Sequence, residues 1–163
     1  MADNQKNGSA AKDQTPQQVP LQARMISQYV KDLSFENPNI RKLITGPGDP
    51  PNINVEVGVS ADKIENDLYE SLVMFKATAT NNVGSVYLLE VEYAGMFKIE
   101  SVPEQALEPF LLISGPTMLF PFLRRLVADV TREGGLLAAT PRGLALARGF
   151  QAWRKILRAP LGG

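Results

Sequence analysis

The sequence predicts an α+β fold, in which helices pack on one side of a four-stranded antiparallel sheet. Apolar and polar side chains alternate in several runs, most clearly over residues 53–60, and this alternation is typical of half-buried strands. The turns between successive runs are short, which implies antiparallel neighbours. Toward the C-terminus the alternation gives way to a helical stripe over residues 116–132.

The first predicted strand covers residues 25–36, where Tyr29, Leu33 and Phe35 fall on one parity. Residues 37–51 hold four prolines and two glycines, and we expect a long irregular connection there. The same alternation predicts further strands at residues 67–80, 86–93 and 96–100.

Two helices are predicted after the strands, at residues 103–114 and 116–132. The second has the stronger apolar stripe, which we expect to consist of Leu119, Leu123, Leu126, Val127 and Val130. Pro121 is early enough to be tolerated in or near the first turn, or it kinks the helix. The Gly134-Gly135 pair is expected to stop the helix.

Composition limits the chemistry that this chain can perform. Its 163 residues suit one domain, and they include no cysteine and no histidine. Disulfides, thiolate chemistry and histidine-based triads are therefore excluded, and the commonest metal ligand is missing. We expect no enzymatic activity, no metal and no cofactor. No apolar run of about 18 residues and no apolar leader is evident, so stable membrane insertion is not expected and the cytoplasm is the expected location.

Charge is unevenly distributed although the net charge is zero. Residues 1–133 hold all 17 acids and 12 Lys or Arg, which is a net charge of −5, whereas residues 134–163 hold five bases and no acid. An acidic body argues against nucleic acid as a partner.

The two ends of the chain differ from its middle. Residues 1–20 are polar and aperiodic, and we expect a disordered arm. Residues 136–163 form a basic tail with a possible helix at 144–158, whose stripe is Leu146, Phe150, Trp153 and Leu157. The tail has three interpretations, in decreasing order of preference: the product of a shifted reading frame, a divergent packed helix, or a membrane-surface segment.

Acidic side chains share strand faces in two places. Asp32 and Glu36 have the same parity on the first strand, and Glu90 and Glu92 lie beside Leu88 on a later one. Such a face is either an ordinary solvated surface or an interface for a basic partner. Nothing in the sequence marks a sugar cleft or a calcium loop, so a catalytic carboxylate pair and a metal site are disfavoured.

Three segments carry a resemblance to a known family: MISQYVKDLSFENPN at residues 25–39, LLEVEYAGMF at 88–97 and PTMLFPF at 116–122. Together they resemble the SecB export chaperones. The likeness covers about residues 21–135, the predicted SecB-like domain, and stops after Gly135.

The resemblance implies a cytoplasmic chaperone that holds unfolded precursor proteins and delivers them to the SecA motor. It implies a homotetramer built as a dimer of dimers. The alternative is a binding module on the same scaffold that serves one partner, such as a toxin–antitoxin system.

The resemblance also implies roles for particular residues. Those that match the family's SecA contacts are Asp32, Glu36, Leu88 and Glu90. The aromatic side chains of the strands are expected first of all in the core. The resemblance implies that part of this surface lines a substrate groove, for which the expected residues are Phe35, Tyr69, Tyr93 and Phe97. The expected oligomer interface is Leu119, Leu123, Leu126 and Val130.

Overall fold

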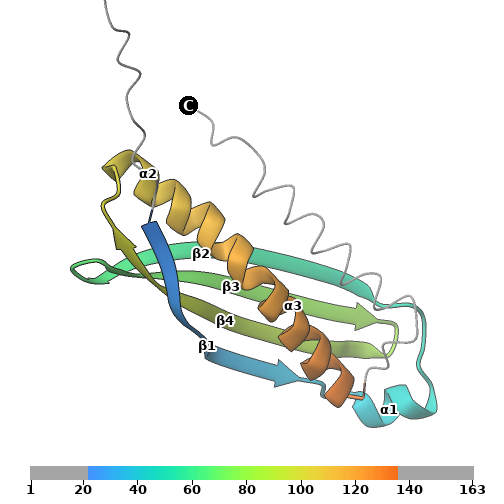
Figure 1. Ribbon diagram of the computed structural model, residues 1–163. Coiled ribbons are helices and arrows are strands. Elements are labelled where there is room, and N and C mark those ends of the chain that lie inside the picture. The colour runs from blue at the N-terminus through green and yellow to red at the C-terminus, as the bar shows by residue number, and fades with distance from the viewer. Residues whose placement is uncertain (1–21, 136–163) are drawn as a thin grey trace, which may run out of the picture.

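The computed structural model describes residues 22–135 and confirms the predicted α+β fold. One antiparallel sheet has the strand order β1-β4-β3-β2, and a helical run lies across one of its faces (Figure 1). The strands are β1 (Gln22–Glu36), β2 (Asn52–Glu65), β3 (Leu68–Asn81) and β4 (Gly84–Glu100). The predictions for residues 1–20 and for the tail at 136–163, including its helix at 144–158, lie outside the described residues.

Strand β4 is longer than the sequence suggested. Residues 86–93 and 96–100 were predicted as two strands, but β4 is continuous through Ala94 and Gly95, which pair with β1 and β3. The prediction was wrong because Gly95 does not serve a turn. A Cβ at this position would lie 2.7 Å from Cδ2 of Leu119, so the glycine lets a helix approach the sheet closely.

Strand β1 contains an irregularity that changes which side chains share a face. Tyr29 pairs with Ala94 and Asp32 pairs with Glu92, so the register shifts at Lys31. An extra residue reverses the alternation beyond it. The prediction that Tyr29 lies on the same face as Phe35 is therefore wrong: the two side chains are on opposite faces of the sheet.

The two predicted helices form one uninterrupted run. Helix α2 (Glu104–Pro109) continues through a π-turn, η1 (Phe110–Ser114), into α3 (Gly115–Glu133). Oγ of Ser71 donates a hydrogen bond of 2.7 Å to the carbonyl of Leu111, which ties the π-turn to β3. The predicted stop is confirmed, since Gly135 has a φ of 77° and its N–H donates to the carbonyl of Arg132.

The connection between β1 and β2 is more regular than expected. It contains a short helix, α1 (Ile40–Thr45), whose Leu43 is buried. Asparagine side chains anchor it to the β3–β4 end of the sheet. Nδ2 of Asn39 donates to the carbonyl of Ser85 at 3.0 Å, and Nδ2 of Asn81 donates to that of Pro47 at 3.0 Å.

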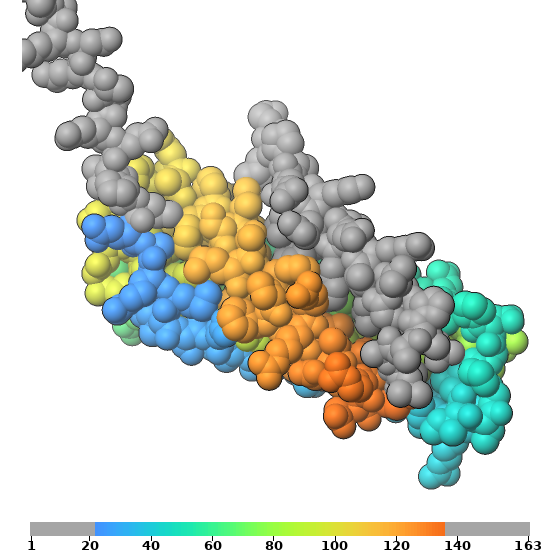
Figure 2. All heavy atoms as spheres, turned by 45° about the vertical axis from the view of Figure 1, so that its right-hand side comes forward, coloured from blue at the N-terminus to red at the C-terminus, as the bar shows by residue number. Residues whose placement is uncertain are grey.

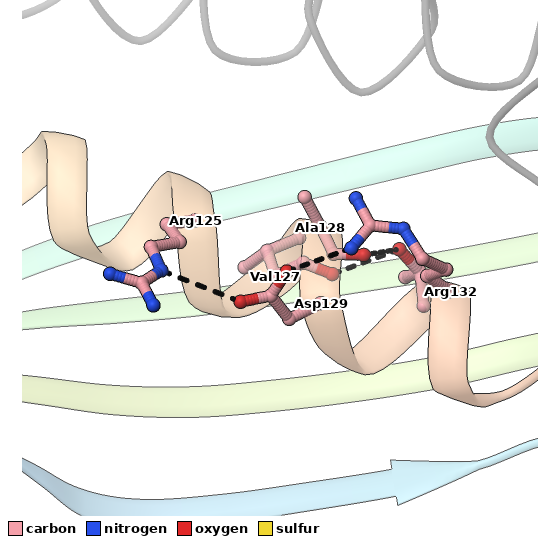
Figure 3. A network of polar contacts seen from close by, with 6 residues as sticks. Arg125, Val127, Ala128, Asp129 and Arg132 are labelled. Carbon is pink, nitrogen blue, oxygen red and sulfur yellow. Dashed lines mark hydrogen bonds and ion pairs between the residues drawn. The ribbon is translucent and has the colours of Figure 1, made fainter.

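Helix α3 provides the main core by packing its apolar stripe on the sheet. Leu119, Leu123 and Val127 are fully buried against side chains of the strands. Figure 2 shows the helical run, in yellow to orange, beside β1 in blue, with the α1 end of the molecule in cyan. On the solvent side of α3, Asp129 lies between Arg125 at 3.6 Å and Arg132 at 3.1 Å (Figure 3).

Residues Glu104–Glu133 are, among residues 22–135, the one helical segment with the length and apolar composition to cross a membrane. This segment is not an uninterrupted apolar run, so it does not stand out in the sequence as a membrane span. The core helix of a soluble protein meets the same criteria. Here Leu119, Leu123 and Val127 pack against the sheet and are buried within the domain. The apolar composition of the helix is therefore explained by the core and does not by itself indicate a membrane span.

Candidate functional site: the open face of the sheet

The sheet has one face that the helical run does not cover. Along β4 the side chains of Leu89, Val91 and Tyr93 are buried in the core beneath α3. Successive side chains of a strand point to opposite faces, so their neighbours Leu88, Glu90 and Glu92 lie on the other side. We call this side the open face; within residues 22–135 no helix lies over it (Figure 1).

The structure places all four predicted SecA-contact residues on the open face. Glu36 and Leu88 are directly opposite each other in the β1–β4 pairing, and so are Asp32 and Glu92. Glu90 lies between these two pairs, opposite Ser34. Residues that are 52 to 60 positions apart in the sequence are therefore side by side, because β1 pairs with β4 and not with β2.

A shallow depression of about 410 Å³ lies at the centre of this face. Asp32 and Glu90 line it, whereas Glu36 and Leu88 lie beyond its end. Its other polar lining residues are Glu56, Lys76 and Glu92. Four carboxylates against one lysine give the depression a negative potential, which suits a basic partner.

The sequence alone did not show that β2 and β3 contribute to this site. Glu56 and Gly58 come from β2, and Met74 and Lys76 come from β3. The alternation over residues 53–60 already placed Glu56 and Gly58 on one parity. The strand order was the missing information, because it decides which strands flank Glu90.

Glu70 of β3 forms a cluster with β1 at the edge of the open face. Its carboxylate accepts hydrogen bonds from the Tyr29 hydroxyl and from Nζ of Lys31, the latter at 2.7 Å. Tyr29 lies just before the β1 irregularity and Lys31 is its extra residue, so Glu70 binds β1 at the point where the register shifts. The cluster lies next to Asp32 in the chain and fixes the strand that carries this residue.

Hydrogen bonding shifts the titration of all three groups. The Lys31 and Tyr29 hydrogen bonds lower the pKa of Glu70 against the opposing effect of burial. The bond to Glu70 raises the pKa of Lys31 and, together with burial, raises the pKa of Tyr29 to about 12. The cluster is thus ionised as a carboxylate and an ammonium over the whole neutral range.

We expect Glu70→Gln to lower the free energy of unfolding by about 1–3 kcal/mol at pH 7, because Glu70 is 6% exposed and loses a charged hydrogen bond. The pKa of Glu70 is lowered in the fold, so this stabilisation is present above the ordinary glutamate pKa and is lost as pH falls through the folded value. Urea unfolding at pH 7 and in the acid range measures both effects.

Glu100→Gln is the matched control for this prediction. Glu100 pairs with Lys98 at 2.6 Å, but both side chains are about half exposed, and exposed pairs contribute little. We expect this variant to unfold like the parent protein. If Glu70→Gln destabilises equally at acid and neutral pH, the effect is not that of the ionised carboxylate.

The predicted groove residues do not gather in one groove. Phe97 and Tyr93 are core side chains beneath the helical run, and Phe97 packs edge-on against Phe110 at 5.4 Å. Phe35 stacks on Tyr87 at the other end of β4 and lines a separate hollow of about 440 Å³ with Asn37 and Gly134. Tyr69 is partly buried and packs on the Phe97 cluster.

The predicted interface residues of α3 divide into two kinds. Leu119 and Leu123 are fully buried against the sheet and have no surface left for a second copy. Leu126 and Val130 are only partly buried and remain available. The exposed apolar side chains of the helix are instead Met118 and Phe122, which the sequence stripe did not include.

Comparison with known proteins agrees with this architecture. Residues 14–140 match the family described as "Preprotein translocase subunit SecB". The protein-export protein SecB of Cereibacter sphaeroides is 44% identical over 134 residues, covering 79% of this chain and 78% of its own length. That of Sphingopyxis alaskensis is 43% identical over 114 residues, covering 70% of this chain and 66% of its own length.

A solved structure shares the fold. The SecB-like chaperone of Mycobacterium tuberculosis, determined in complex with a peptide from an antitoxin, aligns with a TM-score of 0.56 at 16% identity. The alignment covers 70% of this chain and 85% of that one. The matched sequence segment includes every strand and helix of the described region. Sequence and fold therefore agree that this chain belongs to the SecB family.

Proposed function

We propose that this SecB-family export chaperone holds non-native precursor proteins, without catalysing a reaction, and delivers them to the SecA motor in the cytoplasm. The observation that carries the proposal is the open face. It gathers Asp32, Glu36, Leu88 and Glu90 from two strands that are distant in sequence onto one surface. These residues match the family's SecA contacts.

The open face suits a basic protein partner on physical grounds. Asp32, Glu36 and Glu90 are exposed or half exposed, so they attract cations without a large desolvation cost. Leu88 beside Glu90 adds an apolar contact of the kind that interfaces use at their centre. A face of this composition favours fast and specific docking more than very tight binding.

Precursor binding requires apolar surface elsewhere on the molecule. Large exposed apolar side chains occur on β1, at Ile26, Val30 and Leu33, and on α3, at Met118 and Phe122. The hollow beside Phe35 adds a partly aromatic surface next to the connection at residues 37–51. Apolar surface binds many sequences because its contribution depends on area rather than on directional bonds.

The same surfaces support the proposal of a homotetramer. β1 is an edge strand of 15 residues, and exposed edges with apolar side chains readily pair with another chain. A dimer formed through the backbone edge of β1, and a dimer of dimers formed through the outer face of α3, would cover these surfaces and would leave the hollow beside Phe35 as the apolar surface open to precursors. The alternative of a dedicated antitoxin partner has only fold-level support, because the SecB-like structure is 16% identical.

We expect the double variant Asp32→Lys/Glu90→Lys to bind SecA about tenfold more weakly than the parent. Each exposed charge contributes little alone, but two reversals on one face add repulsion to the lost attraction. Calorimetric titration with purified SecA measures the affinity. Suppression of the aggregation of an unfolded precursor should be unchanged, because these residues lie outside the apolar surfaces.

Glu104→Lys/Glu108→Lys makes the same change in net charge on exposed positions of α2, on the opposite side of the sheet. This control should retain the parent affinity for SecA. Equal affinity of the parent and the open-face variant would show that SecA docks elsewhere. Equal weakening by the control would show that only net charge matters.

A further inference from the structure

Lys76 occupies the centre of the open face. In the sheet register it is directly opposite Glu56 on β2 and directly opposite Glu90 on β4. Its Nζ lies 2.9 Å from Oε1 of Glu90, and both side chains are partly exposed, at 44% and 45%. The hydrogen bond to Glu90 raises the pKa of Lys76, so the lysine is charged throughout the neutral range.

The other carboxylates at this place are in a different situation. Asp32 and Glu92 are directly opposite each other on β1 and β4, and like charges in this position repel. Within residues 22–135, the ion pairs of β1, β3 and β4 use Glu70, Glu90 and Glu100, but neither Asp32 nor Glu92. An incoming cation would relieve this repulsion, whereas at Glu90 it would meet a carboxylate that is already paired.

We propose that Lys76 is a built-in competitor of the docking partner: it occupies the Glu90 carboxylate, and a cation of the partner must displace it to bind there. This inference rests on the proposed docking of SecA at the open face. It makes Lys76 a residue that sets the affinity and directs the first cationic contact to Asp32 and Glu92. The Lys76–Glu90 pair is exposed enough to open, so displacement lowers affinity without blocking the face.

Charge and geometry support the role of Lys76 as a competitor rather than only as a residue that stabilises the pairing of β3 with β4. A lysine in the middle of an otherwise acidic depression reduces the attraction that the surrounding carboxylates exert on a basic partner. The lysine side chain is flexible and its ammonium is a single compact charge. It can therefore change rotamer and leave Glu90 when another cation binds there. A pair that served the fold alone would have no effect on partner affinity once folding is complete.

The test is the affinity of purified SecA for Lys76→Gln, measured by calorimetric titration at low and moderate salt. We expect binding about two- to fivefold tighter than for the parent, because Glu90 is released. Lys98→Gln is the matched control. Lys98 is on the neighbouring strand β4, is similarly exposed and pairs with Glu100 at 2.6 Å, but it does not line the depression. It should leave the affinity nearly unchanged.

A double-mutant cycle with Glu90→Gln separates competition from a general charge effect. In the Glu90→Gln background the gain from Lys76→Gln should be clearly smaller, because Glu90 is no longer there to be released and only the general effect of Lys76 on Glu56 and the other carboxylates remains. An unchanged or weaker affinity of Lys76→Gln, or an equal gain in both backgrounds, would overturn the inference. If Asp32→Lys/Glu90→Lys weakens binding while Lys76→Gln has no effect, only this inference fails; if neither has an effect, the proposed docking fails with it.

Discussion

Replacing Leu123 by Asp is expected to leave the protein largely unfolded at 25 °C. Leu123 is 1% exposed and packs with Leu119 and Val127 into the core between α3 and the sheet. Removing a buried leucine side chain alone costs about 2–5 kcal/mol, and an unpaired carboxylate adds several more. Domains of this kind are stable by about 5–15 kcal/mol in total. Circular dichroism and urea unfolding measure the loss.

Leu123→Met is the control, because it keeps the volume and the apolar character of the side chain. It should cost less than about 1.5 kcal/mol. If the Leu123→Asp variant melted at the same temperature as the parent, α3 would not be packed on the sheet in the described way.

Replacing the neighbouring Phe122 by Asp is expected to change assembly strongly and the stability of the fold only slightly, unlike Leu123→Asp. Phe122 is 44% exposed and lies one turn beyond Met118, which is 45% exposed. These side chains form the apolar outer surface of α3, which the proposed tetramer would bury. A carboxylate there would be desolvated in an interface but remains hydrated on a separate protomer.

We therefore expect Phe122→Asp to sediment as a smaller species than the parent, with little change in secondary structure. Analytical ultracentrifugation at several protein concentrations measures the change. Arg41→Gln on α1 changes the net charge equally but lies at the other end of α3 from Phe122, and it should retain the parent mass. A Phe122→Asp protein that keeps the parent mass would show that this surface is not an assembly interface.

The sequence by itself determined the parts of the fold that depend on local periodicity. The alternation at residues 53–60 marked β2, the stripe at 116–132 marked α3, and Gly134-Gly135 marked its end. These features were readable because a strand repeats every two residues and a helix every 3.6, so the buried face appears within a short window. The residues matching the family's docking contacts were also identified, but not their surroundings.

The tertiary structure decided everything that depends on contacts between distant segments. Glu70 holds β1 from 41 residues away, and the irregularity beside it puts Tyr29 on the face opposite Phe35. Gly95 continues a strand because Leu119 approaches it, although a glycine in that context usually suggests a break.

Tertiary contacts also decide that Leu123 is buried while its neighbour Phe122 is exposed. They decide as well that Lys76 pairs with Glu90. Periodicity shows which side chains of one element share a face, but strand order and register determine which residues of other elements they contact. Those are fixed by packing across the whole domain, and no local window of the sequence contains them.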